Sequence, residues 1–179
     1  MAEYKKDPKK NTIAALVSNR SGVLTRISGL FARRGYNIES LTVCATEDPE
    51  LSRMTIVLVG DEYTLYQMIK QMDKLDDVKK IGCADELDCV YRELLLVKVP
   101  ASPEVRSQIV EIRDIYKAKV VDLSVDTMIL ELTGIPTKVD AFLKVIEPYG
   151  IIEMQRTGVT VLARGRHTLK DRDCYGDNI

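Results

Sequence analysis

The chain has 179 residues, 45% of them hydrophobic and 30% charged, which suits one domain or two small ones with a substantial buried core. Its formal net charge of −1 argues against a dedicated nucleic-acid-binding protein, which usually carries a basic excess on one face. No apolar run reaches the roughly 18 residues of a membrane-spanning helix, and the charged start MAEYKKDPKK is not a secretory signal, so we expect a cytoplasmic protein without a membrane partner.

Six elements are predicted after a flexible polar extension at 1–11. The first is a buried strand at 12–17 (TIAALV), which is short, apolar and contains β-branched side chains. A helix over about 22–34 follows, with Ser21 as its expected N-cap and one apolar face formed by Val23, Ile27, Leu30 and Phe31. The remaining elements are a second helix at 62–75 and strands at 37–46, 52–59 and 78–83.

The order of these elements, βαββαβ, is that of a ferredoxin-like fold. Right-handed crossovers place both helices on one face of a four-stranded sheet. The strand at 52–59 is apolar on both of its alternating sets, which is typical of a strand that is buried on both faces. The second face of the sheet must therefore be covered, and association through the sheet or its edge predicts a dimer.

The same order of elements recurs after a polar, acidic linker at 84–92. Ser102, Pro103 and Glu104 form a strong helix start, an N-cap followed by proline at the first helical position. The expected elements lie at 93–99, 102–116, 119–124, 127–133, 136–149 and 151–156, with 159–163 as a candidate fifth strand. The fold class is therefore α+β, with two ferredoxin-like domains in tandem at 12–83 and 93–165 and a polar tail at 166–179. A single doubly wound sheet is the alternative.

Little in the sequence points to catalysis or metal binding. The single histidine, His167, lies near the tail, and the chain has no GxSxG elbow, HExxH motif or glycine-rich phosphate loop. Acidic residues at 47–50 and 85–88 fall in predicted loops, where solvated surface charge is the preferred interpretation. The cysteines lack the spacing of a zinc knuckle and are expected to be reduced thiols: Cys44, Cys83, Cys89 and Cys174.

The loop before the first helix is different. A helix N-terminus offers unpaired N–H donors and a partial positive charge that can hold a carboxylate, and Gly22 has no Cβ to block close approach. Asn19 and Asn37 flank this helix, and each amide carries both a donor and an acceptor, which suits a free amino acid. On spacing alone, simple helix capping is the preferred alternative.

Several runs of sequence resemble one protein family. Residues 19–26 (NRSGVLTR) resemble the effector loop of an ACT domain. Residues 29–43 (GLFARRGYNIESLTV), 51–56 (LSRMTI) and 59–62 (VGDE) are more specific, and they resemble the small subunit of acetohydroxyacid synthase, also called acetolactate synthase. Further runs are similar to the same family, at 93–99, 139–143 (VDAFL) and 156–158 (RTG). The resemblance extends over about 12–165, while the N-terminal extension and the tail are longer than the usual core.

This resemblance implies a non-catalytic subunit that activates a separate large subunit and confers feedback inhibition, typically by valine, in branched-chain amino acid biosynthesis. It implies a homodimer formed through the ACT domain, with the effector at the dimer interface. Thiamine diphosphate, Mg and FAD are expected in the catalytic large subunit and no cofactor in this chain. Asn19, Gly22 and Asn37 match the family's valine contacts. Adjacent candidates for apolar contact are Val23, Leu24 and Ile38.

Two other functions are alternatives. The first half alone would suit a stand-alone ACT sensor that acts as a metabolic or transcriptional co-regulator, whereas the second half favours the synthase family. Copurification with a large thiamine-dependent protein separates these two possibilities. An autonomous enzyme is the third, and turnover of pyruvate by the isolated chain would support it.

Overall fold

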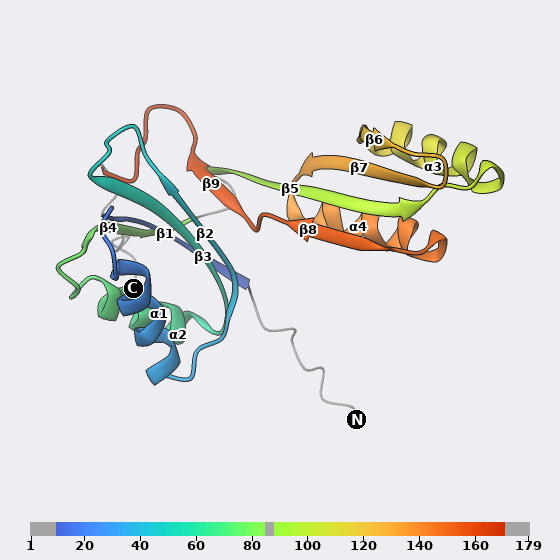
Figure 1. The fold of residues 1–179 in the computed structure, drawn as a ribbon. Coiled ribbons are helices and arrows are strands. Elements are labelled where there is room, and N and C mark those ends of the chain that lie inside the picture. Colours follow the sequence, from blue (N-terminus) through green and yellow to red (C-terminus); the bar gives the residue numbers. More distant parts are fainter. Residues whose placement is uncertain (1–9, 85–87, 171–179) are drawn as a thin grey trace, which may run out of the picture. The chain divides into compact units, whose positions relative to one another are not determined.

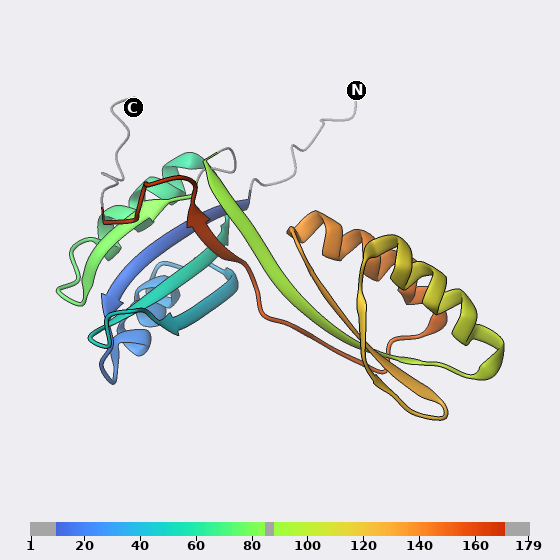
Figure 2. The same cartoon turned by 90° about the horizontal axis from the view of Figure 1, so that it is seen from above.

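The computed structural model describes residues 10–84 and 88–170, and the chain divides into two compact units. The first unit comprises residues 1–90 together with 161–179, and the second comprises residues 91–160. Each unit has its own sheet and its own pair of helices (Figures 1 and 2). Most of the expected N-terminal extension, the end of the polar tail and Cys174 lie outside the described residues.

The first unit is a four-stranded antiparallel sheet with α1 and α2 on one face (Figure 1). Its strand order, β2-β3-β1-β4, is that of a ferredoxin-like fold, so the predicted fold class is confirmed. The elements are β1 (Lys10–Ser18), α1 (Val23–Arg33), β2 (Ile38–Ala45), β3 (Leu51–Val59), α2 (Glu62–Met72) and β4 (Val78–Cys83).

Alternating side chains of β1 and β3 form the core with the two helices. Successive strand residues point to opposite faces, so Ile13 and Ala15 pack under the helices while Ala14 and Leu16 point the other way. The predicted stripe of α1 is buried in this core: Val23, Ile27, Leu30 and Phe31. Each such burial stabilises the fold by about 1.5–3 kcal/mol.

The start of α1 differs from the expectation. The N-cap residue is Gly22 rather than Ser21, and its φ of 82° lies in the left-handed region that favours glycine. No side chain in the described part of the chain caps this helix, whereas Asp61 caps α2 by accepting from the Thr64 N–H at 2.7 Å. The first turn of α1 therefore lacks the side-chain acceptor that helix starts usually have.

The second face of this sheet is covered by the chain itself. Val161 of β9 (Thr160–Ala163) and Leu169 are buried there and line a small cavity with Ala14. The Arg53 Nη2 donates to the Val161 carbonyl oxygen at 2.9 Å. Figure 1 shows β9 on the side of the sheet away from α1 and α2. The expectation of burial on both faces is confirmed, and residues 161–170, the covering segment, supply cover from within the chain, while the dimer stays a prediction.

The second unit repeats the topology with the strand order β6-β7-β5-β8. Its elements are β5 (Cys89–Pro100), α3 (Pro103–Tyr116), β6 (Lys119–Leu123), β7 (Thr127–Gly134), α4 (Pro136–Ile146) and β8 (Glu153–Arg156). Helices α3 and α4 lie on one face of this sheet (Figure 2). The core between them contains Leu95, Val97 and Val99 of β5, and Tyr116 meets Phe142 edge-on at 5.2 Å.

Three boundaries differ from the sequence expectation. Part of the expected linker is strand, because β5 begins at Cys89, which is buried, and β9 pairs with this strand. The candidate fifth strand forms as β9, but residues 161–163 belong to the first unit. Helix α4 ends at Ile146 and a 3-10 turn, Glu147–Tyr149, follows, because Pro148 has no N–H for an α-helical hydrogen bond.

Candidate effector-binding site

The loop between β1 and α1 is hydrogen-bonded to the β2–β3 hairpin. The backbone N–H of Asn19 donates to the Glu50 carbonyl oxygen at 2.7 Å, and the Asn19 Nδ2 donates to the Pro49 carbonyl oxygen at 2.9 Å. The donor side of this exposed amide is therefore engaged in the fold. Its carbonyl oxygen is the group that remains to accept from an ammonium group.

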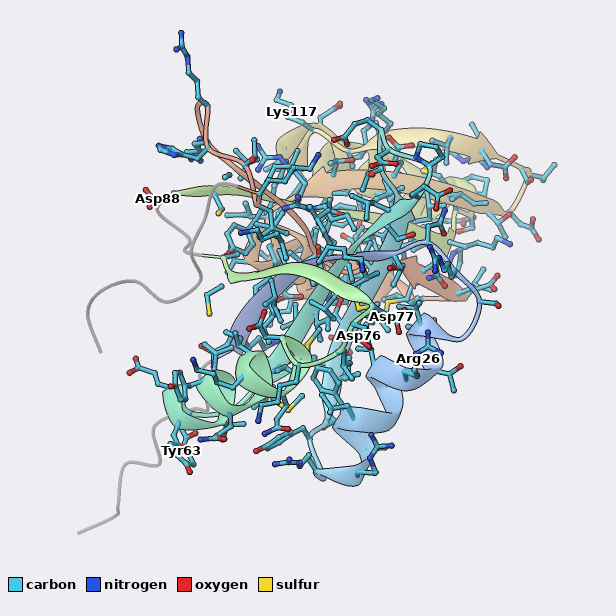
Figure 3. All side chains as sticks on the ribbon, turned by 90° about the vertical axis from the view of Figure 1, so that its left-hand side faces the viewer. Arg26, Tyr63, Asp76, Asp77, Asp88 and Lys117 are labelled. Carbon is cyan, nitrogen blue, oxygen red and sulfur yellow. The ribbon has the colours of Figure 1, made fainter. Side chains whose placement is uncertain are left out.

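A second set of polar contacts joins the end of β1 and the start of α1 to the loop after α2. The Ser18 N–H donates to the Asp77 carbonyl oxygen at 2.8 Å, and the Arg26 Nε lies 2.6 Å from the Asp77 Oδ2. Figure 3 shows Arg26 beside Asp76 and Asp77. The contacts with the β2–β3 hairpin and with the loop after α2 together fix the position of the start of α1. A preorganised binding loop requires such contacts.

Gly22 lies where a Cβ would crowd the helix start. A Cβ built on Gly22 would lie 3.2 Å from the Arg26 Nη1, and the positive φ strains any larger residue at this position. The partial positive charge of the helix N-terminus favours a bound carboxylate, whereas the Arg26 guanidinium is already ion-paired with Asp77. The start of α1 therefore has features typical of an anion-binding loop, and binding of a carboxylate there stays a prediction.

The other predicted residues fall into different environments. The Val23 side chain is only 3% exposed and belongs to the core, so it presents no apolar surface to a ligand. Leu24 is 47% exposed beside the helix start. Ile38 is half-buried against the edge of the core, and Asn37 before it is exposed. Of the apolar candidates, Leu24 is the most exposed, and it lies next to the start of α1.

Asn19 and Asn37 lie at opposite ends of the sheet. Ser18, the residue before Asn19, pairs with Leu51 of β3, whereas Ile38, the residue after Asn37, pairs with Leu58. Seven residues of extended strand separate these two points, which corresponds to about 23 Å. One small amino acid cannot bridge the two amides of a single chain.

Strand β2 is an edge of this sheet, and its one charged residue, Glu39 near its start, is ion-paired with Lys10. It pairs with β3 on one side, and residues 40–45 (SLTVCA) carry no charge. Val43 and Cys44 are exposed there. Proteins usually protect such an edge with charge, proline or a covering element, so the uncharged part of β2 at 40–45 favours pairing with another chain.

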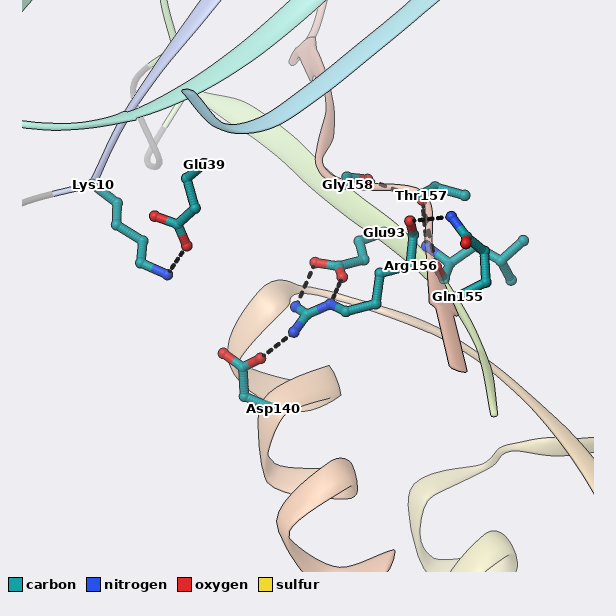
Figure 4. Close-up of polar contacts among 9 residues, drawn as sticks. Lys10, Glu39, Glu93, Asp140, Gln155, Arg156, Thr157 and Gly158 are labelled. Atoms are coloured by element: carbon teal, nitrogen blue, oxygen red, sulfur yellow. Dashed lines mark hydrogen bonds and ion pairs between the residues drawn. The ribbon is translucent and has the colours of Figure 1, made fainter. Parts of the chain in front are cut away.

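The structure also reveals an ionic cluster that sequence reasoning missed (Figure 4). Arg156 of β8 forms a bidentate ion pair with Glu93 of β5, whose carboxylate is almost fully buried, and its Nη1 lies 2.7 Å from the Asp140 Oδ1 of α4. The hydrogen bond to Glu93 is the main cause that raises the pKa of Arg156 above its ordinary value. The three residues come from runs noted separately for their family resemblance, and only the fold brings them together.

No metal site is formed in residues 10–84 and 88–170, because no three His, Cys, Asp or Glu side chains there are grouped to hold an ion. None of the helices in these same ranges is long and apolar enough to span a membrane. His167 is exposed, and Cys44, Cys83 and Cys89 form no disulfide in the described residues.

Comparison with known families defines the class of the first unit and then that of the whole chain. Residues 13–80 match the model described as AHAS small subunit-like ACT domain, so the first unit is an ACT domain. Residues 92–165 match the model described as small subunit of acetolactate synthase.

Whole-chain relatives agree with both matches. A probable acetolactate synthase small subunit from Archaeoglobus fulgidus is 51% identical over 87% of this chain and 98% of its own length. The acetolactate synthase small subunit of Mycolicibacterium smegmatis is 47% identical over 87% of this chain and 91% of its own. The crystal structure of the Thermotoga maritima small subunit superposes with a TM-score of 0.82 at 37% identity, over 89% of this chain and 99% of that one. The chain belongs to the family of acetolactate synthase small subunits.

Proposed function

We propose that this chain is the regulatory subunit of an acetolactate synthase in the cytoplasm: it activates a thiamine-diphosphate-dependent catalytic subunit and makes that enzyme sensitive to valine. The observation that carries the proposal is the uncapped, glycine-started helix of an ACT domain in a chain whose two halves both match small-subunit families. Catalysis and its cofactors, thiamine diphosphate, Mg and FAD, are assigned to the partner.

The effector site is completed by a second copy. In an antiparallel pairing of two β2 edges, the start of one β2 lies beside the end of the other. The end of β2 is near the Asn19 loop, because Ala45 pairs with Ser52 of β3 and Ser18 pairs with the adjacent Leu51. A two-fold dimer of this kind therefore brings Asn37 of one copy to the Asn19 and Gly22 of the other, which creates two equivalent sites.

Each half of this site has a distinct chemical role. The N–H groups at the start of α1 attract the carboxylate of the amino acid, while the Asn19 and Asn37 amide oxygens accept from its ammonium group. Leu24 supplies apolar contact for the side chain. Because one methylene in an apolar pocket changes binding by only about 1–3 kcal/mol, leucine and isoleucine should also inhibit at higher concentration.

The decisive experiment is an acetolactate assay of the catalytic subunit with and without this chain, titrated with valine, leucine and isoleucine. Asn37→Ala and Gly22→Asp should keep the activation and relieve the inhibition, whereas Lys144→Ala on α4 should change neither. If both site variants stayed fully sensitive to valine, the site assignment would be wrong. If no thiamine-dependent partner copurified and activity did not rise, the stand-alone sensor would replace the proposed function.

A further inference from the structure

Strand β6 forms an exposed apolar edge of the second unit. It pairs with β7 on one side and stands at the end of the strand order. The short stretch from the end of α3 to the β6–β7 turn contains four aliphatic side chains that are at least half exposed: Ile115, Val121, Leu123 and Val125. Arg106 holds the turn in place, since its Nη2 donates to the Val125 carbonyl oxygen at 2.5 Å. The apolar side chains are thus exposed together on an ordered edge.

A β-bulge places the two charges of this strand on the same face. Lys119 pairs with Glu131 and Val120 with Leu130, but Asp122 then pairs with Ile129, so Val121 is the extra residue. Leu130 belongs to the core, and Glu131 and Ile129 point away from it. Lys119 and Asp122 therefore both lie on the face of the sheet away from α3 and α4.

This arrangement is self-complementary about a two-fold axis. If two copies of β6 meet antiparallel with the axis between Val120 and Val121, Lys119 of each copy lies opposite Asp122 of the other. Residues directly opposite in an antiparallel pair share a face, so this register requires Lys119 and Asp122 to lie on one face of their own strand. In a regular strand, residues three apart point to opposite faces, and the bulge removes that conflict.

We propose that the β6 edge, Lys119–Leu123 with Val125, is a self-association surface that binds the β6 edge of a second copy of this chain. Two symmetric Lys119–Asp122 pairs set the register, and the exposed aliphatic side chains supply the buried area. An isologous contact needs a patch that complements itself, and the charge pattern of this strand meets that requirement, with Lys119 exposed beside Glu131 of its own chain at 3.7 Å. The surface is separate from the β2 edge invoked for the effector site, so the inference goes beyond the proposed function and does not depend on it.

Charge reversal in two separate variants tests the register. Lys119→Glu places Glu opposite Asp122, and Asp122→Lys places Lys opposite Lys119, so each variant alone should associate through β6 roughly tenfold more weakly than the natural chain. A mixture of the two variants restores opposite charges in both pairs and should recover the association. Glu153→Lys, on the other edge strand of the same sheet, is the matched control and should have no effect.

Proximity crosslinking provides the readout for the full-length chain. Val121→Cys, in a background with Cys44→Ser and Cys174→Ser, places a thiol beside the proposed axis. A short bis-maleimide should then give covalent dimers that depend on Val121→Cys, with yield lost in each charge variant and regained in their mixture. Crosslinking that is absent from Val121→Cys, or that persists unchanged in Lys119→Glu and Asp122→Lys, would overturn the proposal. Circular dichroism confirms that each variant is folded, and valine sensitivity tests the proposed function separately.

Discussion

Arg156 joins three elements of the second unit through two carboxylates, and the two contacts should differ in strength. The Glu93 carboxylate is 2% exposed, whereas that of Asp140 is 48% exposed and in contact with water. A buried carboxylate that loses its cation keeps the cost of burial without the compensating attraction. An ion pair in contact with water is screened and contributes little.

Arg156→Met should therefore lower the free energy of unfolding by about 3 kcal/mol, because Glu93 would stay buried without a partner. The double variant Glu93→Leu/Arg156→Met should recover a large part of this loss. Asp140→Ala is the matched control and should cost less than about 1 kcal/mol. Urea unfolding followed by circular dichroism measures all three, and equal losses in the single and double variants would contradict this account.

Lys117 is strained at the end of α3. It has a φ of 58° and a ψ of 37°, and among the described residues it is the one non-glycine residue with a positive φ. Figure 3 labels its position. A side chain in this conformation costs about 1–2 kcal/mol, and glycine offsets part of the gain by its greater freedom when unfolded. Lys117→Gly should raise the free energy of unfolding by about 0.5–1 kcal/mol, measured by thermal or urea denaturation. Lys117→Ala keeps the Cβ and should give no such gain.

Single residues show where sequence reasoning stops. The apolar stripe of α1 follows from local spacing, since its members are three or four positions apart and the helix period brings them together. Glu93 and Arg156 are separated by 63 positions, and no local period relates them. Whether Gly22 or Ser21 is the N-cap of α1 depends on a backbone angle that composition does not determine.

At the scale of elements, β3 also has one property that the sequence predicts and one that it does not. Its apolar side chains on both faces predicted burial on both sides, and this is confirmed. Periodicity reports that a face is apolar without specifying what covers it. The cover comes from residues 161–170, which are separated from β3 by the whole second unit. The topology of each half was predictable because adjacent elements in this fold are joined by short connections.

The covering segment should contribute measurably to the stability of the first unit. Leu169 is 7% exposed, whereas Leu162 in the same segment is 57% exposed. Leu169→Ala removes buried methyl groups and leaves a cavity, so it should lower the free energy of unfolding by about 2–3 kcal/mol. Leu162→Ala is the same chemical change at an exposed position and should cost less than about 0.5 kcal/mol. Equal costs in urea titrations would show that the segment is not packed on the sheet.

At the scale of the whole molecule, the proposed effector site needs residues from two chains. The Asn19 loop and Asn37 lie about 23 Å apart along β3 in one copy. Either residue could be essential for a single-chain site elsewhere, so ordinary substitutions do not distinguish a shared site from two separate effects. The symmetry of the proposed dimer does distinguish them, because each copy contributes one half to each of two sites.

Mixing two inactive variants should therefore restore valine binding. A dimer of Asn19→Ala chains has both sites damaged, and so does a dimer of Asn37→Ala chains. A mixed dimer has one site with both substitutions and one site with neither. After equal amounts are unfolded and refolded together, about half of the dimers are mixed, and about a quarter of all sites should bind valine with natural affinity. Isothermal titration calorimetry measures that stoichiometry. A mixture that binds no better than its components would show that Asn19 and Asn37 of different copies do not share a ligand.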